Sequence, residues 1–157
     1  MIVLLTKVRL SPTILAGMVC FLEMKNGQMN SYYRGQHART YNRRWQSYTE
    51  KTLAQAKAMI DVDALSQGTA QRKRPPCVLD LACGTGLLLQ YLLERVPSLE
   101  AYGLDASLDM LAQAREALKD QPHVHFAQAD LNQRGWTPVS YAPKTFDLIT
   151  CTNALHN

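Results

Sequence analysis

The sequence predicts an α/β fold with a doubly wound parallel sheet, and two observations support this prediction. First, short apolar runs alternate with helical patterns from residue 77 to the end of the chain. Second, the first run ends in a turn of small residues, Asp80-Leu81-Ala82-Cys83-Gly84-Thr85-Gly86, which a leucine-rich helical pattern follows directly. Strands that alternate with helices form parallel sheets with right-handed crossovers. A glycine turn between strand and helix is where such sheets hold a nucleotide-like ligand.

The elements before the sheet are predicted from composition and periodicity. Residues 1–29 form an extension of uncertain role, because the apolar run 13–22 is too short to span a bilayer and no small-x-small cleavage site follows it. Residues 30–65 carry apolar residues at three- to five-residue steps, which predicts a helical segment interrupted near Thr49. Residues 66–76 lack this periodicity and end in Pro75-Pro76, so we expect a linker there.

Aromatic side chains are dense in the helical segment, and two interpretations of them stay open. The set consists of Tyr32, Tyr33, Tyr41, Trp45 and Tyr48. Its members either pack onto the sheet, which we favour, or form a lid over the ligand cleft. The segment 30–65 is therefore treated as a lid or cap that precedes the sheet.

The predicted sheet domain covers residues 77–157. Its strands are expected at 78–82, 99–104, 124–129 and 146–152, and its helices at 85–95 and 107–119. Ser107 is the expected N-cap of the second helix, and residues 131–145 read as a loop. The sequence stops just after the fourth strand, so we expect that strand to lie unpaired at an edge and the C-terminal strands of a doubly wound sheet to be missing.

Charge and cysteine content restrict the class of protein. Residues 1–76 contain 12 Lys and Arg against 4 Asp and Glu, whereas residues 77–157 contain 5 against 9. A basic N-terminal part could contact RNA, an acidic metabolite or a membrane surface, but solvated helix faces and the basic run 72–74 are the simpler explanation. The four cysteines form no C-x-x-C pair, so we expect no metal site and a reducing, cytoplasmic location.

The glycine turn separates two kinds of nucleotide site. A nicotinamide or flavin site requires G-x-G-x-x-G, and Leu89 occupies the position of the third glycine, which disfavours an NAD(P)-dependent oxidoreductase. The stretch from Asp80 to Gly86 instead resembles the first motif of class I S-adenosylmethionine-dependent methyltransferases. This resemblance implies their Rossmann-like fold and S-adenosyl-L-methionine as cofactor. Ala82 stands where many members of the family have a glycine.

Three later motifs agree with the resemblance. Asp105 follows Gly86 by nineteen residues and ends the second predicted strand, where a carboxylate can accept from both hydroxyls of a ribose. In the family, Met110 corresponds to an apolar residue beside the adenine, and Asp130 to an acceptor for its amino group. The resemblance implies the cofactor-binding set Asp80, Ala82, Gly84, Thr85, Gly86, Asp105, Ala106, Met110, Asp130, Leu131 and Asn153.

The resemblance also implies the reaction. It is in-line transfer of a methyl group to a small-molecule acceptor, in which positioning and desolvation supply much of the catalysis. No catalytic residue is assigned; His156 and His37 are candidates for a general base, which is needed only if the acceptor must lose a proton. The N-x-x-x-P-P-Y/F signature of enzymes that methylate nucleic-acid amino groups is absent, which argues against a nucleic-acid acceptor. The alternative function is a non-catalytic remnant or regulatory module that binds the cofactor weakly or not at all. The sequence does not determine the oligomeric state.

Overall fold

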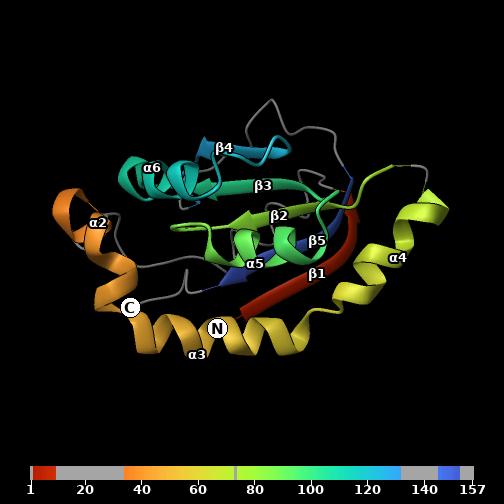
Figure 1. The fold of residues 1–157 in the computed structure, drawn as a ribbon, viewed down its shortest axis with the longest axis horizontal. Helices are drawn as coiled ribbons and strands as arrows, with labels where there is room; N and C mark the ends of the chain where they lie inside the picture. The colour runs from red at the N-terminus through yellow and green to blue at the C-terminus, as the bar shows by residue number, and fades with distance from the viewer. Residues whose placement is uncertain (1, 10–33, 73, 132–144, 153–157) are drawn as a thin grey trace.

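A five-stranded sheet forms the centre of the computed structural model of the protein (Figure 1). The structure describes residues 2–9, 34–72, 74–131 and 145–152. Within these ranges the strands are β1 (Ile2–Arg9), β2 (Cys77–Leu81), β3 (Glu100–Asp105), β4 (Val124–Gln128) and β5 (Thr145–Thr152). The helices are α2 (Gly35–Arg44), α3 (Gln46–Met59), α4 (Val62–Arg72), α5 (Leu87–Arg95) and α6 (Leu108–Ala117).

The order of the strands confirms the predicted α/β fold. The sheet runs β1-β5-β2-β3-β4, and β5, β2, β3 and β4 are parallel to one another. The chain proceeds outward from β2 to β3 and β4 and then returns to pair β5 with the other side of β2. This reversal makes the C-terminal ends of β2 and β5 the switch point of a doubly wound sheet, where such folds bind ligands.

The expectation that the fourth predicted strand would be left unpaired is wrong. This strand is β5, and β1 pairs with it in antiparallel register, with Leu4 opposite Thr150 and Val8 opposite Phe146. β1 comes from the segment for which the sequence indicated no role. An unpaired strand edge presents backbone N–H and C=O groups that any extended segment can satisfy, so the partner of β5 need not follow it in sequence.

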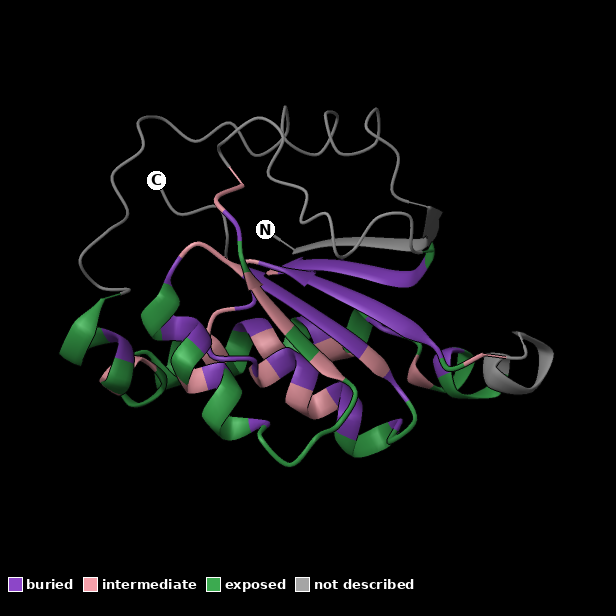
Figure 2. Ribbon diagram, turned by 90° about the horizontal axis from the view of Figure 1, so that it is seen from above, coloured by how far each residue is buried: buried purple, intermediate pink, exposed green. Residues whose placement is uncertain are grey.

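The described helices lie on one side of the sheet, as Figure 2 shows. The leucines of α5 pack against this face of the sheet. Four of them are buried in one cluster with Val78 of β2 and Ala101 of β3: Leu88, Leu89, Leu92 and Leu93. Lys57 of α3 contacts Tyr91 of α5, its Nζ lying 4.3 Å from the centroid of the Tyr91 ring. The guanidinium carbon of Arg95, also on α5, lies 3.8 Å from the same centroid. The glycine turn therefore projects from a well-packed layer.

The segment before the sheet is helical, as predicted, but its boundaries differ. The break between α2 and α3 is at Trp45 rather than near Thr49. α4 continues to Arg72, so the first part of the predicted linker is helical. Among residues 62–67 of this helix, whose burial is described, Leu65 is the buried one.

The aromatic residues of this segment do not all pack inside the protein. Trp45 and Tyr48 are 41% and 40% exposed, so packing onto the sheet does not account for them. Tyr41 is half-buried, whereas Tyr32 and Tyr33 lie outside the described residues. The lid interpretation of the segment stays a prediction.

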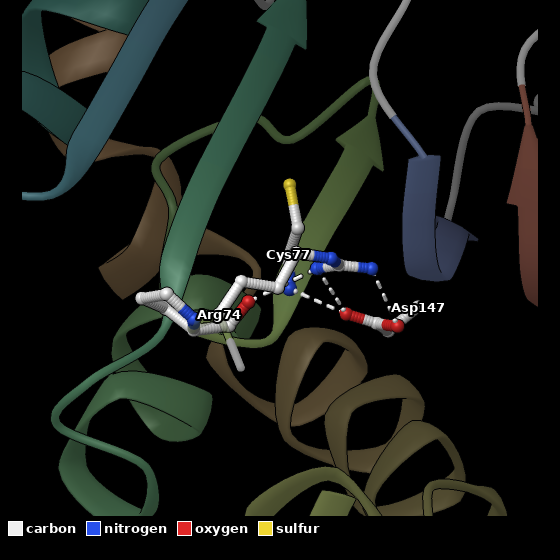
Figure 3. Close-up of polar contacts among 4 residues, drawn as sticks. Arg74, Cys77 and Asp147 are labelled. Carbon is white, nitrogen blue, oxygen red and sulfur yellow. Dashed lines mark hydrogen bonds and ion pairs between the residues drawn. The ribbon is translucent and has the colours of Figure 1, made fainter. Parts of the chain in front are cut away.

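An ionic contact fastens the start of β2 to β5 (Figure 3). Both guanidinium Nη atoms of Arg74 donate to Asp147, Nη1 to Oδ2 at 2.9 Å and Nη2 to Oδ1 at 3.1 Å. The backbone N–H of Cys77 donates to the same Oδ2 at 2.9 Å. The side chain of Asp147 is only 4% exposed. One buried carboxylate thus satisfies the first residue of β2 and anchors the segment that leads into it.

Gly103 in β3 leaves space for the side chain of the residue opposite it in β4. It is opposite Phe126 in the register, and a Cβ at Gly103 would lie 2.7 Å from two atoms of the Phe126 ring and 2.9 Å from Cys83 Sγ. We expect Gly103→Ala to lower the free energy of unfolding by about 1–3 kcal/mol, the usual cost of overpacking. Urea unfolding measures this effect, and Gly103→Ala in a Phe126→Ala background is the matched comparison. An equal loss in both backgrounds would contradict the role assigned to the ring.

Within the described ranges, no helix is long and apolar enough to cross a membrane.

Candidate functional site

The turn after β2 has the backbone conformation that its sequence predicts. Gly84 and Gly86 have φ values of +56° and +79°, in the left-handed region that glycine tolerates. Ala82 also has a positive φ, +54°, which costs an L-residue roughly 1–2 kcal/mol. Cys83 N–H donates to Leu104 O at 2.9 Å, which ties the turn to β3. Strain of this kind persists where surrounding contacts impose it, commonly at ligand sites.

The same glycines allow α6 to approach the turn. A Cβ at Gly84 would lie 3.4 Å from Met110 Cε, and one at Gly86 would lie 3.3 Å from Ala114 Cβ. Met110 is itself buried. The absence of side chains at these two glycines therefore allows α6 to pack closely against the turn, in addition to allowing a ligand to approach it.

Asp105, at the end of β3, is linked directly to the turn. Gly84 N–H donates to its Oδ2 and Ser107 N–H to its Oδ1, each at 2.8 Å. Burial raises the pKa of Asp105, and backbone hydrogen bonds from Ser107, Gly84 and Ala106 oppose this rise. A carboxylate has about four acceptor positions, so these three donors do not use all of its acceptor capacity. The two oxygens lie at a fixed spacing, as acceptors of a pair of neighbouring hydroxyls must.

Asp80, near the end of β2, is the other acid of the site and is 1% exposed. Its Oδ1 lies 2.7 Å from Thr150 Oγ1 of β5. Burial raises the pKa of Asp80 to about 7; the hydrogen bond from Thr150 lowers it, and the charge of Asp105 raises it further. The switch point of the sheet thus holds two neighbouring carboxyl groups, one of which titrates near neutral pH.

α2 contacts both the turn and the start of α6. Thr85 Oγ1 donates to Asn42 Oδ1 at 2.7 Å, and Gly35 N–H donates to Asp109 Oδ2 at 2.8 Å. α2 therefore lies beside the C-terminal edge of the strands (Figure 1). The predicted N-cap of α6 is confirmed, since Ser107 Oγ accepts from Met110 N–H at 3.2 Å.

The other residues predicted for the site have fewer described contacts with the glycine turn. Ala106 follows Asp105 directly, and Asp130 and Leu131 come just after β4, all three half-buried. The backbone connects β4 to the site, because Ala129 N–H donates to Asp105 O at 3.0 Å. Asn153 and the candidate base His156 lie outside the described residues. The other candidate base, His37, is exposed on α2, where its Nδ1 is 3.2 Å from Arg44 Nη1.

Sequence reasoning missed three polar partners of the site. Thr150 lies in an apolar strand pattern, while Asn42 and Asp109 are polar residues of helices. The one available signal was Thr150, a hydroxyl within a buried strand, because such a group requires a partner.

The described residues of the site offer groups that suit a nucleoside. Among the described residues, no group of three or more His, Cys, Asp or Glu side chains is placed to hold a metal. The site instead offers a paired acceptor in Asp105, backbone at two glycines without side chains, and the buried apolar side chain of Met110. These are the donor and packing groups that a ribose and a base require, so the cofactor implied by the motif fits the residues present.

Comparison with known proteins identifies relatives of this site. A family model described as a methyltransferase domain matches residues 78–157. Trans-aconitate 2-methyltransferase of Azoarcus sp. strain BH72 is 44% identical over 63 residues, which cover 40% of this chain and 23% of that protein. The Escherichia coli K12 enzyme of the same name is 38% identical over 78 residues, covering 50% of this chain and 27% of its own.

The chain therefore spans about a quarter of the length of these curated relatives. The crystal structure of Streptomyces venezuelae DesVI is 28% identical, with a TM-score of 0.41, and the match covers 60% of this chain and 37% of that one. The family model covers the glycine turn, both acids and every later motif. The chain belongs to the class I S-adenosylmethionine-dependent methyltransferase domains.

Proposed function

We propose that this protein binds S-adenosyl-L-methionine at the turn after β2 and transfers its methyl group to a small-molecule acceptor. One observation carries the proposal: Gly84, in a positive-φ turn at the switch point of the sheet, donates its N–H to the Asp105 carboxylate. Because of this contact, the two carboxylate oxygens of Asp105, which can accept from hydroxyls, lie beside a glycine backbone that a ligand can approach closely. Sheets of this topology bind nucleotides at that edge.

Four residues of the site have a specific role in the proposal. Asp105 accepts from the two ribose hydroxyls, and Met110 packs beside the adenine. Asp130 accepts from the adenine amino group, and Asn153 contacts the methionine part. The other proposed cofactor-binding residues are Asp80, Ala82, Thr85, Gly86, Ala106 and Leu131.

When bound, the cofactor would supply a methyl group on a sulfonium, an activated leaving group, so that the bond to the acceptor nucleophile could form as the carbon–sulfur bond breaks and its electron pair stays on sulfur as a thioether. The protein's part is to orient the two reactants in line and to exclude water, which is the larger part of catalysis in such a displacement.

We further propose that residues 30–65 act as a lid. The support is that α2 holds both sides of the site, through Asn42 on the turn and through Gly35 on Asp109 of α6. Each of these two hydrogen bonds contributes roughly 0.5–1.5 kcal/mol, and α2 also buries Ala38. Trp45 and Tyr48 of the same segment are partly exposed to solvent.

The acceptor proposed here is a small organic acid in a cytoplasmic setting. The two curated relatives named above are described as trans-aconitate methyltransferases, so trans-aconitate is the first acceptor to assay. Arg39 and Arg43 of α2 are exposed, and α2 contains no acidic residue, which favours an anionic acceptor. Among the described residues, Cys77, Cys83 and Cys151 are buried and form no disulfide, which agrees with a reducing compartment.

Calorimetric titration separates this function from its alternatives. We expect S-adenosylmethionine and S-adenosylhomocysteine to bind and NADH not to bind. Binding of NADH alone would point to an oxidoreductase and reject the proposal. Binding of S-adenosylhomocysteine without methyl transfer to any organic acid would favour a non-catalytic cofactor-binding module.

Asp105→Ala tests the ribose assignment. We expect S-adenosylhomocysteine affinity to fall by about 1–3 kcal/mol, the scale of hydrogen bonds to a charged group. Asp120→Ala, which removes an exposed acid beyond the far end of α6, is the control and should leave the affinity unchanged. A folded Asp105→Ala protein with full affinity would refute the assignment.

A further inference from the structure

We propose that Asp80 is a proton-linked binding residue, which holds a proton in the unliganded protein and releases it when the cationic cofactor binds. This inference rests on the proposed function, and it concerns how the site recognises charge rather than which ligand it takes. Three features of the structure support it: the hydrogen bonds around Thr150, the charges that face Asp80, and the place of Asp80 directly before the turn.

The hydrogen bonding around Asp80 is sparse for a buried carboxylate. Asp80 is 1% exposed, and among the described residues its side chain has one hydrogen-bond partner, Thr150 Oγ1, at 2.7 Å from Oδ1. The same hydroxyl lies 3.4 Å from the carbonyl oxygen of Leu79, and its single proton cannot be donated to both oxygens at once. A carboxylate has about four acceptor positions, so these residues leave most of the ionised form unsatisfied, and the hydrogen bond from Thr150 offsets the effect of burial only in part.

The charges that face Asp80 also oppose its ionisation. Burial is the largest cause of the raised pKa of Asp80, and the charge of Asp105 on β3 raises it further. Asp80 in turn raises the pKa values of the Cys83 thiol in the turn and the Cys151 thiol in β5, so neither thiol supplies a charge near neutral pH. Arg115 of α6 acts on the Cys83 thiol and is not among the causes of the Asp80 shift.

A cationic ligand would supply the missing charge. S-Adenosylmethionine carries a sulfonium and an ammonium group near neutral pH, and a positive charge close to a carboxyl group favours its ionised form. Asp80 lies two residues before the strained Ala82 and belongs to the same strand end as the turn. Without a cation, the charge of one carboxylate disfavours ionisation of a neighbouring carboxyl group; when a cation is bound beside them, both can be ionised. Binding and proton release are then thermodynamically coupled.

Calorimetry of the whole chain in two buffers tests the inference. The titrants are S-adenosylmethionine and S-adenosylhomocysteine, and the buffers share one pH but differ in ionisation enthalpy. We expect the binding heat to depend on the buffer, with about half a proton released at pH 7 and close to one at pH 6, because the group titrates near pH 7. Greater release with S-adenosylmethionine assigns the effect to the sulfonium, and equal release assigns it to the ammonium that both ligands carry.

Two variants make the result specific to Asp80. Asp80→Asn should bind with no buffer-dependent heat. Thr150→Val removes the hydrogen bond that lowers the pKa of Asp80 and should move the release to higher pH. Binding by the natural protein without proton release, or unchanged release from Asp80→Asn, would overturn the inference alone. If neither ligand binds the natural protein, the proposed function itself fails, and this inference fails with it.

Discussion

Replacing Asp147 by alanine is expected to lower the free energy of unfolding by about 2–4 kcal/mol, because a buried donor loses its partner and a charge pair is broken. The side chain of Asp147 is 4% exposed and accepts from Cys77 N–H at the first residue of β2. Arg74 is 39% exposed, so water can solvate its freed guanidinium and the ionic part of the loss is small. Most of the effect should come from the unsatisfied Cys77 N–H, and urea unfolding at pH 7 measures it.

Asp147→Asn and Arg74→Ala are the matched controls. Asparagine keeps an oxygen that can accept from Cys77, so it should cost less than alanine. Arg74→Ala leaves Asp147 bonded to Cys77 and should cost about 1 kcal/mol or less, as expected for a partly exposed ion pair. A loss for Arg74→Ala as large as that for Asp147→Ala would show that the ion pair, and not the backbone hydrogen bond, dominates.

Replacing Asp80 by asparagine is expected to stabilise the unliganded protein at pH 8, by up to about 4 kcal/mol, if the pKa of Asp80 is about 7 when folded and 3.8 when unfolded. The sign follows from the direction of the shift. Between pH 4 and 7 the folded state binds more protons at this position than the unfolded state, so the natural protein loses stability as the pH rises through this window. Asparagine removes the titrating group and hence this dependence.

Unfolding at pH 5 and pH 8 isolates this effect from other titrating groups. The stabilisation by Asp80→Asn should be about 2–3 kcal/mol larger at pH 8 than at pH 5, which is the part of the linkage that falls between these pH values. The same increment at both pH values would contradict a folded pKa near 7. A variant that is more stable but binds S-adenosylhomocysteine less tightly would identify Asp80 as a group kept for binding rather than for stability.

The fold and the centre of the site were predictable because their signals are local. A turn that needs positive φ selects glycine, so the backbone at Gly84 and Gly86 could be inferred from sequence alone. Asp105 ends a strand and Ser107 comes directly before a helix, which made the cap recognisable. The order of strands follows from alternation with helices, since right-handed crossovers leave few arrangements of a parallel sheet.

The sequence by itself therefore determined the α/β class, the glycine turn and the acid at the end of β3. Only the tertiary structure decided that β1 pairs with β5, that Asp147 fastens the start of β2, and that Thr150 hydrogen-bonds with Asp80. Each of these contacts joins residues seventy or more positions apart in the chain. Periodicity and turn chemistry record which backbone conformation a residue prefers. The partner of a strand edge or of a buried carboxyl group depends instead on which segments the folded chain brings together.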